Sequence, residues 1–390
     1  KERITGVLLH GLAQIRSLKD RYSGVMHILF FWGFVALFFG TIVVFLQADL
    51  GLQIMHGPFY LYFQSLTLDV LGLLAIVGLI MAVIKRYILR ADRLINPPRH
   101  RTLLDDGVVL SLILTILITG FFLEGIRIVA TSDPWAAWSP VGFAVGSTLT
   151  GLGFDARSLQ EAHRFLWWFH LLLAFAFIAY IPYSKLRHLV LSPANIYFRS
   201  LQPMGALKPI DIETAETLGA PKLDDLTWKQ LLDTVACTEC GRCQAACPAY
   251  STGQPLSPKA LILDLRNQLY QSRHPAAALS FDRKSPIPEA AFKGMEECPI
   301  IAAVTPESLW SCVTCGSCMQ QCPIFVEHVP TIVDLRRYLV MERAEYPELM
   351  QEALSSMEAR GHPFRGTMAS RTDWCEGLDV KIVGEVGAAE

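Results

Sequence analysis

The sequence contains little charge for its length. Of its 390 residues, 18% are Asp, Glu, Lys or Arg, whereas 52% are hydrophobic. That balance is too apolar for an ordinary soluble protein and indicates a chain that lies partly in a membrane. The formal net charge is -2, so a general basic character is missing and nucleic acid is not a candidate partner.

An N-terminal signal peptide is not recognisable either, and the sequence begins at Lys1. We therefore expect the chain to be a segment of a longer product.

Cysteine, by contrast, is present and concentrated. Eight of the ten cysteines fall in two runs with the spacing C-x2-C-x2-C-x3-C-P, which leaves Cys298 and Cys375 outside. This spacing is typical of cysteines that hold [4Fe-4S] clusters, where the fourth cysteine of each run binds the other cluster. The predicted ligands of the first cluster are Cys237, Cys240, Cys243 and Cys322, and those of the second are Cys312, Cys315, Cys318 and Cys247.

Zinc or disulfide bonds are the alternatives for these cysteines. Zinc sites use pairs of CxxC motifs and not a triple followed by Cys-Pro. Free thiolates used as metal ligands also indicate a reducing compartment. We interpret Cys298 as an inert buried thiol.

Four apolar runs in the first half of the chain are each near the length of a membrane-spanning helix: Val25–Leu46, Leu68–Ile84, Gly107–Leu123 and Phe165–Tyr183. Residues 4–18 have apolar side chains near helical spacing, which predicts an amphipathic helix on the membrane surface; an ordinary packed helix is the alternative. The Trp135–Gly153 stretch is too polar to span and is expected at the interface.

The distribution of basic residues predicts the orientation of the spans. The loop after the second span, the N-terminal segment and the exit of the fourth span are rich in them, whereas the Ala48–Thr67 loop has none. The residues are Arg16, Lys19, Arg21, Lys85, Arg86, Arg90, Arg93, Arg99, Arg101, Lys185 and Arg187. By the positive-inside rule, both ends of the membrane half and the cysteine runs face the cytoplasm of a multi-pass protein of the cell membrane.

Histidines indicate what the membrane half binds. His27 lies near the cytoplasmic end of the first span and His188 just past that end of the fourth, so the two imidazoles can meet at one depth, as the ligands of a b-type haem do. Interfacial histidines that contact headgroups are the alternative. His170 lies about 27 Å along the helix from His188. With His163, two turns earlier, it could serve a second haem or a quinone pocket; a helix-capping or interfacial histidine is the alternative for His163.

Asp69, Glu124 and Arg127 flank the apolar spans on the outer side. Charges at membrane depth are costly, and a quinone headgroup needs a hydrogen-bond donor and a proton source, so these residues are candidates for a quinone site. Side chains that reach out to the interface are the alternative.

The motifs "GVMHILFFWGFVALFFG" and "FHLLLAFAFIAYIPYSKLRH" resemble the haem-carrying spans of the nitrate reductase gamma subunit family. In that family each of these two helices carries two haem-ligating histidines. The resemblance implies a haem b on His27 and His188 and matches His170 to a third ligand, but Leu37 stands at the fourth position. A second haem would then need His163 or His56 as a ligand, or five-coordinate iron.

Little strand patterning occurs in the cytoplasmic half, and helices are predicted over Trp228–Thr234, Ser257–Tyr270 and residues 333–347. The stretches "GRCQAACPAYSTGQPLSPKALILDLR", "LWSCVTCGSCMQQCP" and "GHPFRGTMASRTDWCEGLDV" resemble the membrane-bound heterodisulfide-reductase-related iron–sulfur proteins. That family includes membrane subunits of electron-transfer-flavoprotein:menaquinone oxidoreductases. Its members usually continue into cysteine-rich CCG domains, and no Cys-Cys pair occurs here.

We therefore expect an all-α protein in which a four-span cytochrome b-like bundle is fused to an α-helical two-cluster ferredoxin domain. The expected parts are a surface helix (1–23), the membrane domain (24–190), a linker (191–226), the ferredoxin domain (227–345) and a connector towards a CCG module absent from the chain (346–390).

The resemblance implies an oxidoreductase, part of a complex, that passes electrons from electron-transferring flavoprotein through two [4Fe-4S] clusters and haem b to menaquinone. A quinol-linked heterodisulfide reductase or sulfate-reduction subunit, and a wiring subunit of a larger dehydrogenase, are the alternatives.

Overall fold

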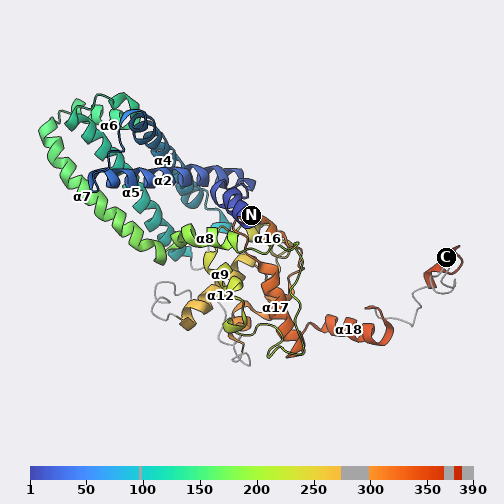
Figure 1. Ribbon diagram of the computed structural model, residues 1–390. Helices are drawn as coiled ribbons and strands as arrows, with labels where there is room; N and C mark the ends of the chain where they lie inside the picture. Colours follow the sequence, from blue (N-terminus) through green and yellow to red (C-terminus); the bar gives the residue numbers. More distant parts are fainter. Residues whose placement is uncertain (96–98, 274–297, 364–372, 380–390) are drawn as a thin grey trace.

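The computed structural model describes residues 1–95, 99–273, 298–363 and 373–379 (Figure 1). These residues form helices and irregular segments without a strand, so the predicted all-α class is confirmed. A bundle of long helices adjoins a part built of short helices (Figure 1). Two pieces of the expected connector, 364–372 and 380–390, lie outside the described residues, as do the side chains of Arg99 and Arg101.

Four helical segments are long and apolar enough to cross a membrane: Arg21–Ala48, Gly57–Ile88, Leu103–Thr131 and Ala156–Tyr183. Each contains one predicted span. They comprise α2 (Arg21–Ala48), the series α3 (Gly57–Phe59), η3 (Tyr60–Thr67), α4 (Leu68–Val83) and η4 (Ile84–Ile88), then α5 (Arg99–Thr131), and α7 (Ala156–Tyr180) with η7 (Ile181–Tyr183). The helices are longer than the predicted spans because their polar ends continue beyond the apolar core.

Glycines let α2 and α4 approach each other closely. A Cβ atom added to Gly33 would lie 2.6 Å from both the Ala75 Cβ and the Leu71 carbonyl oxygen, and one on Gly78 would lie 2.8 Å from the Met26 oxygen. Helices in an apolar surrounding associate through such close packing, because burial from water no longer drives them together. The other long pair is α5 with α7.

The Trp135–Gly153 stretch, predicted not to span, forms η6 (Ala136–Trp138) and α6 (Pro140–Gly151). At 1.5 Å per residue α6 is about 18 Å long, too short to cross the hydrocarbon layer. It packs against α5 and α4. The structure agrees with the prediction that this segment does not span the membrane.

The prediction of a single N-terminal helix over residues 4–18 is wrong. The segment forms α1 (Glu2–Gly6), the wider π-helical turns of η1 (Val7–Leu12), and η2 (Ser17–Lys19). Gln14, with φ at 52°, takes a left-handed conformation that ends the helix. The apolar side chains are nevertheless exposed, Ile4 to 58% and Leu8 to 50%, as a surface in contact with a membrane requires.

After α7 the chain turns through η8 (Lys185–Arg187) into α8 (His188–Tyr197), which lies between the bundle and the short helices (Figure 1). The short helices are α9 (Trp228–Ala236), α10 (Arg242–Ala245), α11 (Pro248–Ser251), α12 (Pro258–Arg273), α14 (Pro299–Val304), α15 (Pro306–Trp310), α16 (Ser317–Gln321) and α17 (His328–Met341), with η9 (Leu223–Asp225) before them. α18 (Glu348–Arg360) and η11 (Asp373–Cys375) follow.

Two of the predicted cytoplasmic helices correspond to α9 and α12. Thr227 and Gln230 cap the start of α9 reciprocally, which explains why that helix begins at Trp228. The third prediction, over residues 333–347, has the wrong bounds. α17 starts five residues earlier, because Pro330 is tolerated in a first turn, and it ends at Met341.

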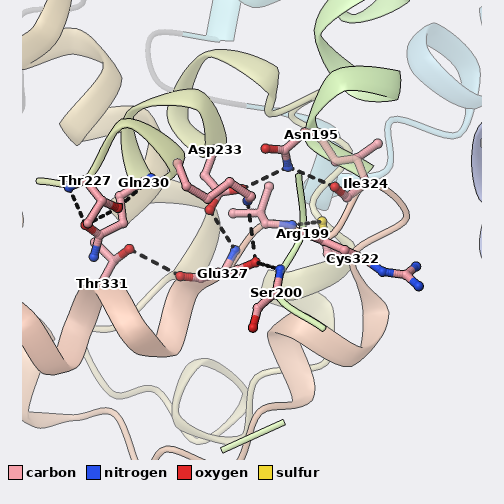
Figure 2. A network of polar contacts seen from close by, with 12 residues as sticks. Asn195, Arg199, Ser200, Thr227, Gln230, Asp233, Cys322, Ile324, Glu327 and Thr331 are labelled. Carbon is pink, nitrogen blue, oxygen red and sulfur yellow. Dashed lines mark hydrogen bonds and ion pairs between the residues drawn. The ribbon is translucent and has the colours of Figure 1, made fainter. Parts of the chain in front are cut away.

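A buried polar network fastens α8 to the short-helix part (Figure 2). Asn195, fully buried, donates from Nδ2 to the Asp233 carboxylate at 2.8 Å and to the Ile324 carbonyl oxygen at 2.9 Å. Lys229 donates to the same carboxylate at 2.6 Å, and so does the backbone N–H of Glu327 at 3.2 Å. These hydrogen bonds hold α8 against α9.

Gly33→Val should destabilise the bundle, because the added side chain would overlap Ala75 and the α4 backbone. Overpacking of this kind costs about 1–3 kcal/mol. Thermal unfolding of the purified protein in detergent would measure the loss. Gly151→Ala, at a helical glycine with open space around it, is the matched control and should leave the melting temperature unchanged or slightly higher. Equal melting temperatures for the two variants would contradict the close α2–α4 contact.

Candidate functional site

The two cysteine runs fold into the same local shape. The residue before the second cysteine of each run has a positive φ, 57° at Glu239 and 52° at Thr314. The glycine after that cysteine does too, 68° at Gly241 and 74° at Gly316. Left-handed residues on both sides of a cysteine curl the chain tightly, and glycine adopts this conformation without strain. Both loops are therefore shaped to wrap around a compact group.

One set of thiols combines three cysteines of the first run with the last cysteine of the second. Burial, together with the neighbouring thiols of Cys240 and Cys237, raises the pKa of Cys322 to about 12. Burial also raises the pKa of Cys243, with Cys237, Cys240 and Cys322 adding to the rise. Buried thiols that repel one another as thiolates are suited to a metal centre, because coordination to iron deprotonates them outright.

The second set has the reverse composition, with three cysteines of the second run and the last cysteine of the first. Burial, together with the thiols of Cys312, Cys247 and Cys315, raises the pKa of Cys318 to about 12. These four cysteines line a small cavity of about 20 Å³. The structure thus brings the eight cysteines into the two crossed groups that the spacing predicts.

The two groups are adjacent, since Cys243 of one and Cys318 of the other pack together with Val329. Across the described residues, no three His, Cys, Asp or Glu side chains come close enough to hold a single metal ion. A cubane is larger than one ion and spaces its thiolates more widely, so the donor sets are compatible with [4Fe-4S] clusters.

His27 on α2 and His188 at the start of α8 face each other, with ring centroids 6.3 Å apart. The Nδ1 atom of His27 lies 2.8 Å from Gln14 Oε1, and that of His188 lies 2.7 Å from the Lys185 carbonyl oxygen. Both oxygens can only accept, so each Nδ1 carries the proton and each Nε2 keeps its lone pair. Burial lowers the pKa of His188, which keeps that imidazole neutral.

This geometry fits a six-coordinate iron. Two imidazoles bound on opposite sides of one metal at about 2 Å each would have centroids about 6 Å apart. A metal-binding histidine almost always donates its other ring N–H to a partner, which fixes the tautomer and the ring orientation. The pair therefore fits haem b.

A cavity of about 330 Å³ adjoins the two imidazoles and reaches the first cysteine loop. Its apolar lining from the bundle includes Met26, Phe31 and Leu110. On the other side it is lined by Cys240 and Arg242. The volume is within the usual range for bound cofactors and ligands.

Cations line the same cavity, most of them paired. Lys185 bonds Asp106 at 2.9 Å, and Arg86 also pairs with Asp106. Arg242 is 9% exposed, and its buried Nε has no hydrogen-bond partner within the described part of the chain. Carboxylates of a bound group, such as haem propionates, would suit this basic lining.

Among the described residues, the rings of His27 and His188 form the one contact between two histidines. His170 therefore has no second imidazole beside it in this part of the chain. Its Nδ1 lies 2.8 Å from the Thr119 hydroxyl on α5, and His163 is half-buried two turns away. Leu37 packs in the apolar core of the bundle. Within the described residues, the geometry thus supports a haem position at His27 and His188 and gives His170 no second histidine as a partner.

The outer polar residues meet at α6. The buried Asp69 carboxylate accepts hydrogen bonds from the N–H groups of Val141 at 2.8 Å and Gly142 at 2.9 Å, so it caps this helix. Glu124 lies beside it, since a Cβ on Gly142 would be 2.7 Å from the Glu124 Cγ. Arg127 is paired with Asp133 at 2.8 Å. Asp69 and Arg127 thus have structural partners, and Glu124 is hydrogen-bonded to Ser139 and Asp69.

Sequence reasoning missed Gln14, the Lys185 carbonyl and Arg242. Gln14 stands in a segment whose periodicity predicts a continuous helix, and a backbone carbonyl leaves no mark in a sequence. Arg242 lies inside the first cysteine run and could have been noticed as a charge next to predicted cluster ligands.

Comparisons with known families agree with this division of the chain. Residues 18–205 match the nitrate reductase gamma subunit family, and residues 236–325 match the 4Fe-4S dicluster domain. The chain therefore joins a nitrate reductase gamma-like membrane domain to a 4Fe-4S dicluster domain.

Curated relatives include EtfAB:quinone oxidoreductase of Syntrophomonas wolfei, 35% identical over 97% of this chain, and the probable iron-sulfur-binding oxidoreductase FadF of Bacillus subtilis, 34% identical over 96%. The chain spans 55% of the length of each. A subunit of the dihydromethanophenazine:CoB--CoM heterodisulfide reductase of Methanosarcina barkeri is 26% identical over 48% of the chain and 63% of its own length. No solved structure matches.

His188→Ala should abolish or strongly reduce haem binding, because it removes one of the two facing imidazoles. Absorption spectra of the dithionite-reduced protein would show this as loss of the b-type bands. His362→Ala, at a histidine that follows α18 and has no proposed ligand role, is the control and should keep them. Full retention of haem after His188→Ala would show that the imidazole pair is not the haem site.

Proposed function

We propose that the chain is a membrane-bound electron-transfer protein that takes electrons from electron-transferring flavoprotein and delivers them to menaquinone. When bound, two [4Fe-4S] clusters and haem b supply the one-electron carriers. The observation that carries the proposal is the shared cavity, which is lined by His27 and His188 on the membrane side and by Cys240 on the other.

The cysteines and histidines have the roles of ligands in this proposal. Cys237, Cys240, Cys243 and Cys322 hold one cluster; Cys247, Cys312, Cys315 and Cys318 hold the other; His27 and His188 hold the haem. The first group adjoins the haem cavity through Cys240. The second group includes the exposed Cys315, next to Val313, which is 66% exposed. A soluble donor can approach the second group, and the first group is next to the membrane domain.

The match to EtfAB:quinone oxidoreductase covers 97% of the chain, whereas the match to the heterodisulfide reductase covers 48%, and this difference supports quinone as the acceptor. We assign the quinone headgroup to the outer end of the bundle at Glu124, with Asp69 and Arg127 beside it. A protonatable carboxyl within a membrane bundle is suited to deliver a proton to a reduced quinone. His170 and His163 are the remaining candidates for that end.

The cytoplasm is the proposed side of the dicluster domain. Lys85, Arg86 and Arg93 lie at the same end of the bundle as Cys240, since all four line one cavity. Basic residues mark the cytoplasmic end of membrane spans, and the cytoplasm keeps thiols reduced.

The proposed function predicts that reduced electron-transferring flavoprotein reduces the purified chain, which in turn reduces a menaquinone analogue. Val313→Glu should slow the step with the flavoprotein and leave reduction by dithionite unchanged. Leu349→Glu, on α18 and 79% exposed, is the matched control. Quinone reduction after dithionite but not after the flavoprotein would show that the donor is wrong. Reduced haem that is never reoxidised by the analogue would show that the acceptor is wrong.

The crossed ligand groups predict which pairs of cysteines act together. Two cubanes give about eight irons per chain. Cys237→Ser with Cys322→Ser should remove one cluster and leave about four irons, because both belong to one group. Cys237→Ser with Cys247→Ser should disrupt both clusters, although these residues share a sequence run. Iron analysis and EPR of the reduced variants would measure the difference, and the reverse pattern would show that each run holds its own cluster.

A further inference from the structure

The segment between η1 and η2 connects the two proposed redox sites. We call residues 14–16 the strap. Gln14 is 3% exposed and lines the haem cavity, although its φ of 52° is unfavourable for a residue with a side chain. Such a conformation persists when the surroundings hold it, and it often accompanies function. Here it turns an amide side chain from a surface segment towards the inside of the protein.

One end of the strap holds His27. Gln14 Oε1 lies 2.8 Å from His27 Nδ1, 13 residues further along the chain. An amide oxygen can only accept, so the contact keeps the proton on Nδ1 and leaves Nε2 free to bind a metal. His188 obtains the same fixation from a backbone carbonyl, which substitution of its side chain cannot remove. Of the two imidazoles, His27 is thus the one fixed by a side chain.

The other end of the strap holds Cys322. Arg16 Nη1 donates to the Cys322 carbonyl oxygen at 2.9 Å, and its guanidinium lies 3.8 Å above the Phe325 ring. Arg199 lies at the same ring, 4.4 Å from its centroid. A guanidinium is always charged, so the strap brings a permanent positive charge to this cysteine.

We infer that Gln14 and Arg16 are positioning residues that set the properties of both centres at the domain boundary, Gln14 through His27 and Arg16 through Cys322. The inference rests on the proposed haem and cluster ligands. An acceptor on Nδ1 makes the opposite nitrogen a more basic ligand, and a more basic ligand favours ferric over ferrous iron. A positive charge near a cluster favours its more negative, reduced form.

Two substitutions of Gln14 should shift the haem midpoint potential in opposite directions. Gln14→Leu removes the acceptor, so the haem midpoint potential should rise and haem affinity should fall about 10–100-fold. Gln14→Glu retains an acceptor and adds negative charge, so the potential should fall. A purely structural role would move both variants in the same direction. Gln160→Leu, at an exposed position on α7, is the matched control and should equal the wild type.

The experiment is a redox titration of the full chain in detergent, followed by absorption for the haem and by EPR for the clusters. Wild-type protein without haem would overturn the proposed haem site itself. Haem-containing wild type with Gln14 variants that shift alike, or not at all, would overturn the strap alone. If Gln14→Leu does not fold, Gln14→Glu decides: a lower potential supports the inference, and an unchanged or higher one overturns it.

Arg16→Gln tests the other end in the same titration. One cluster should become harder to reduce, with its potential shifted downwards, while the haem potential stays near that of the wild type. Arg16→Lys retains the charge and should restore most of the cluster potential. Unchanged cluster potentials in Arg16→Gln would overturn the role of Arg16.

Discussion

The boundary between the two parts of the protein depends on one arrangement, a pair of neutral imidazoles whose Nδ1 atoms are both bonded to carbonyl oxygens. His27 and His188 come from opposite ends of the membrane domain sequence, yet their ring centroids lie 6.3 Å apart. Once both Nδ1 atoms donate to carbonyl oxygens, each neutral ring has only its Nε2 left, and that atom can only accept. Such a pair of imidazoles would suit the two histidine ligands of a haem iron, and a cavity of about 330 Å³ adjoins them.

Several separate segments meet to make that arrangement. α2 contributes His27, η8 and α8 contribute the Lys185 carbonyl and His188, and the N-terminal strap contributes Gln14. The first cysteine loop completes the cavity. α8 itself is fastened to α9 by the buried Asn195–Asp233 contact. α8 carries His188 at one end and Asn195 towards the other. The dicluster domain therefore packs on the same helix that positions the His188 imidazole.

Charged groups are buried at this boundary because they are paired. Glu239, in the first cysteine loop, bonds the fully buried Arg266 at 2.5 Å and lies 3.5 Å from Lys185. Lys185 in turn bonds Asp106 of α5 at 2.9 Å. Unpaired charges would be costly here, so the network fixes how the two parts meet. It also gives the cavity a basic edge, with Arg242 as the cation whose Nε keeps a free donor in the described structure.

The sequence alone determined the cluster-binding runs, the four spans and the helical class, because each depends on local information. Ligand spacing, apolar run length and hydrophobic period can be read from neighbouring residues. Local periodicity failed at Gln14, where contacts with distant segments hold a left-handed residue that ends the expected helix, and at the bounds of α17. The sequence also predicted that His27 and His188 meet, and their rings lie 6.3 Å apart. Only the tertiary structure decided that Gln14 contacts His27, that His170 meets Thr119, and that Asp69 caps α6. The physical reason is that these contacts join residues far apart in the chain, whose distances depend on helix packing and not on sequence spacing.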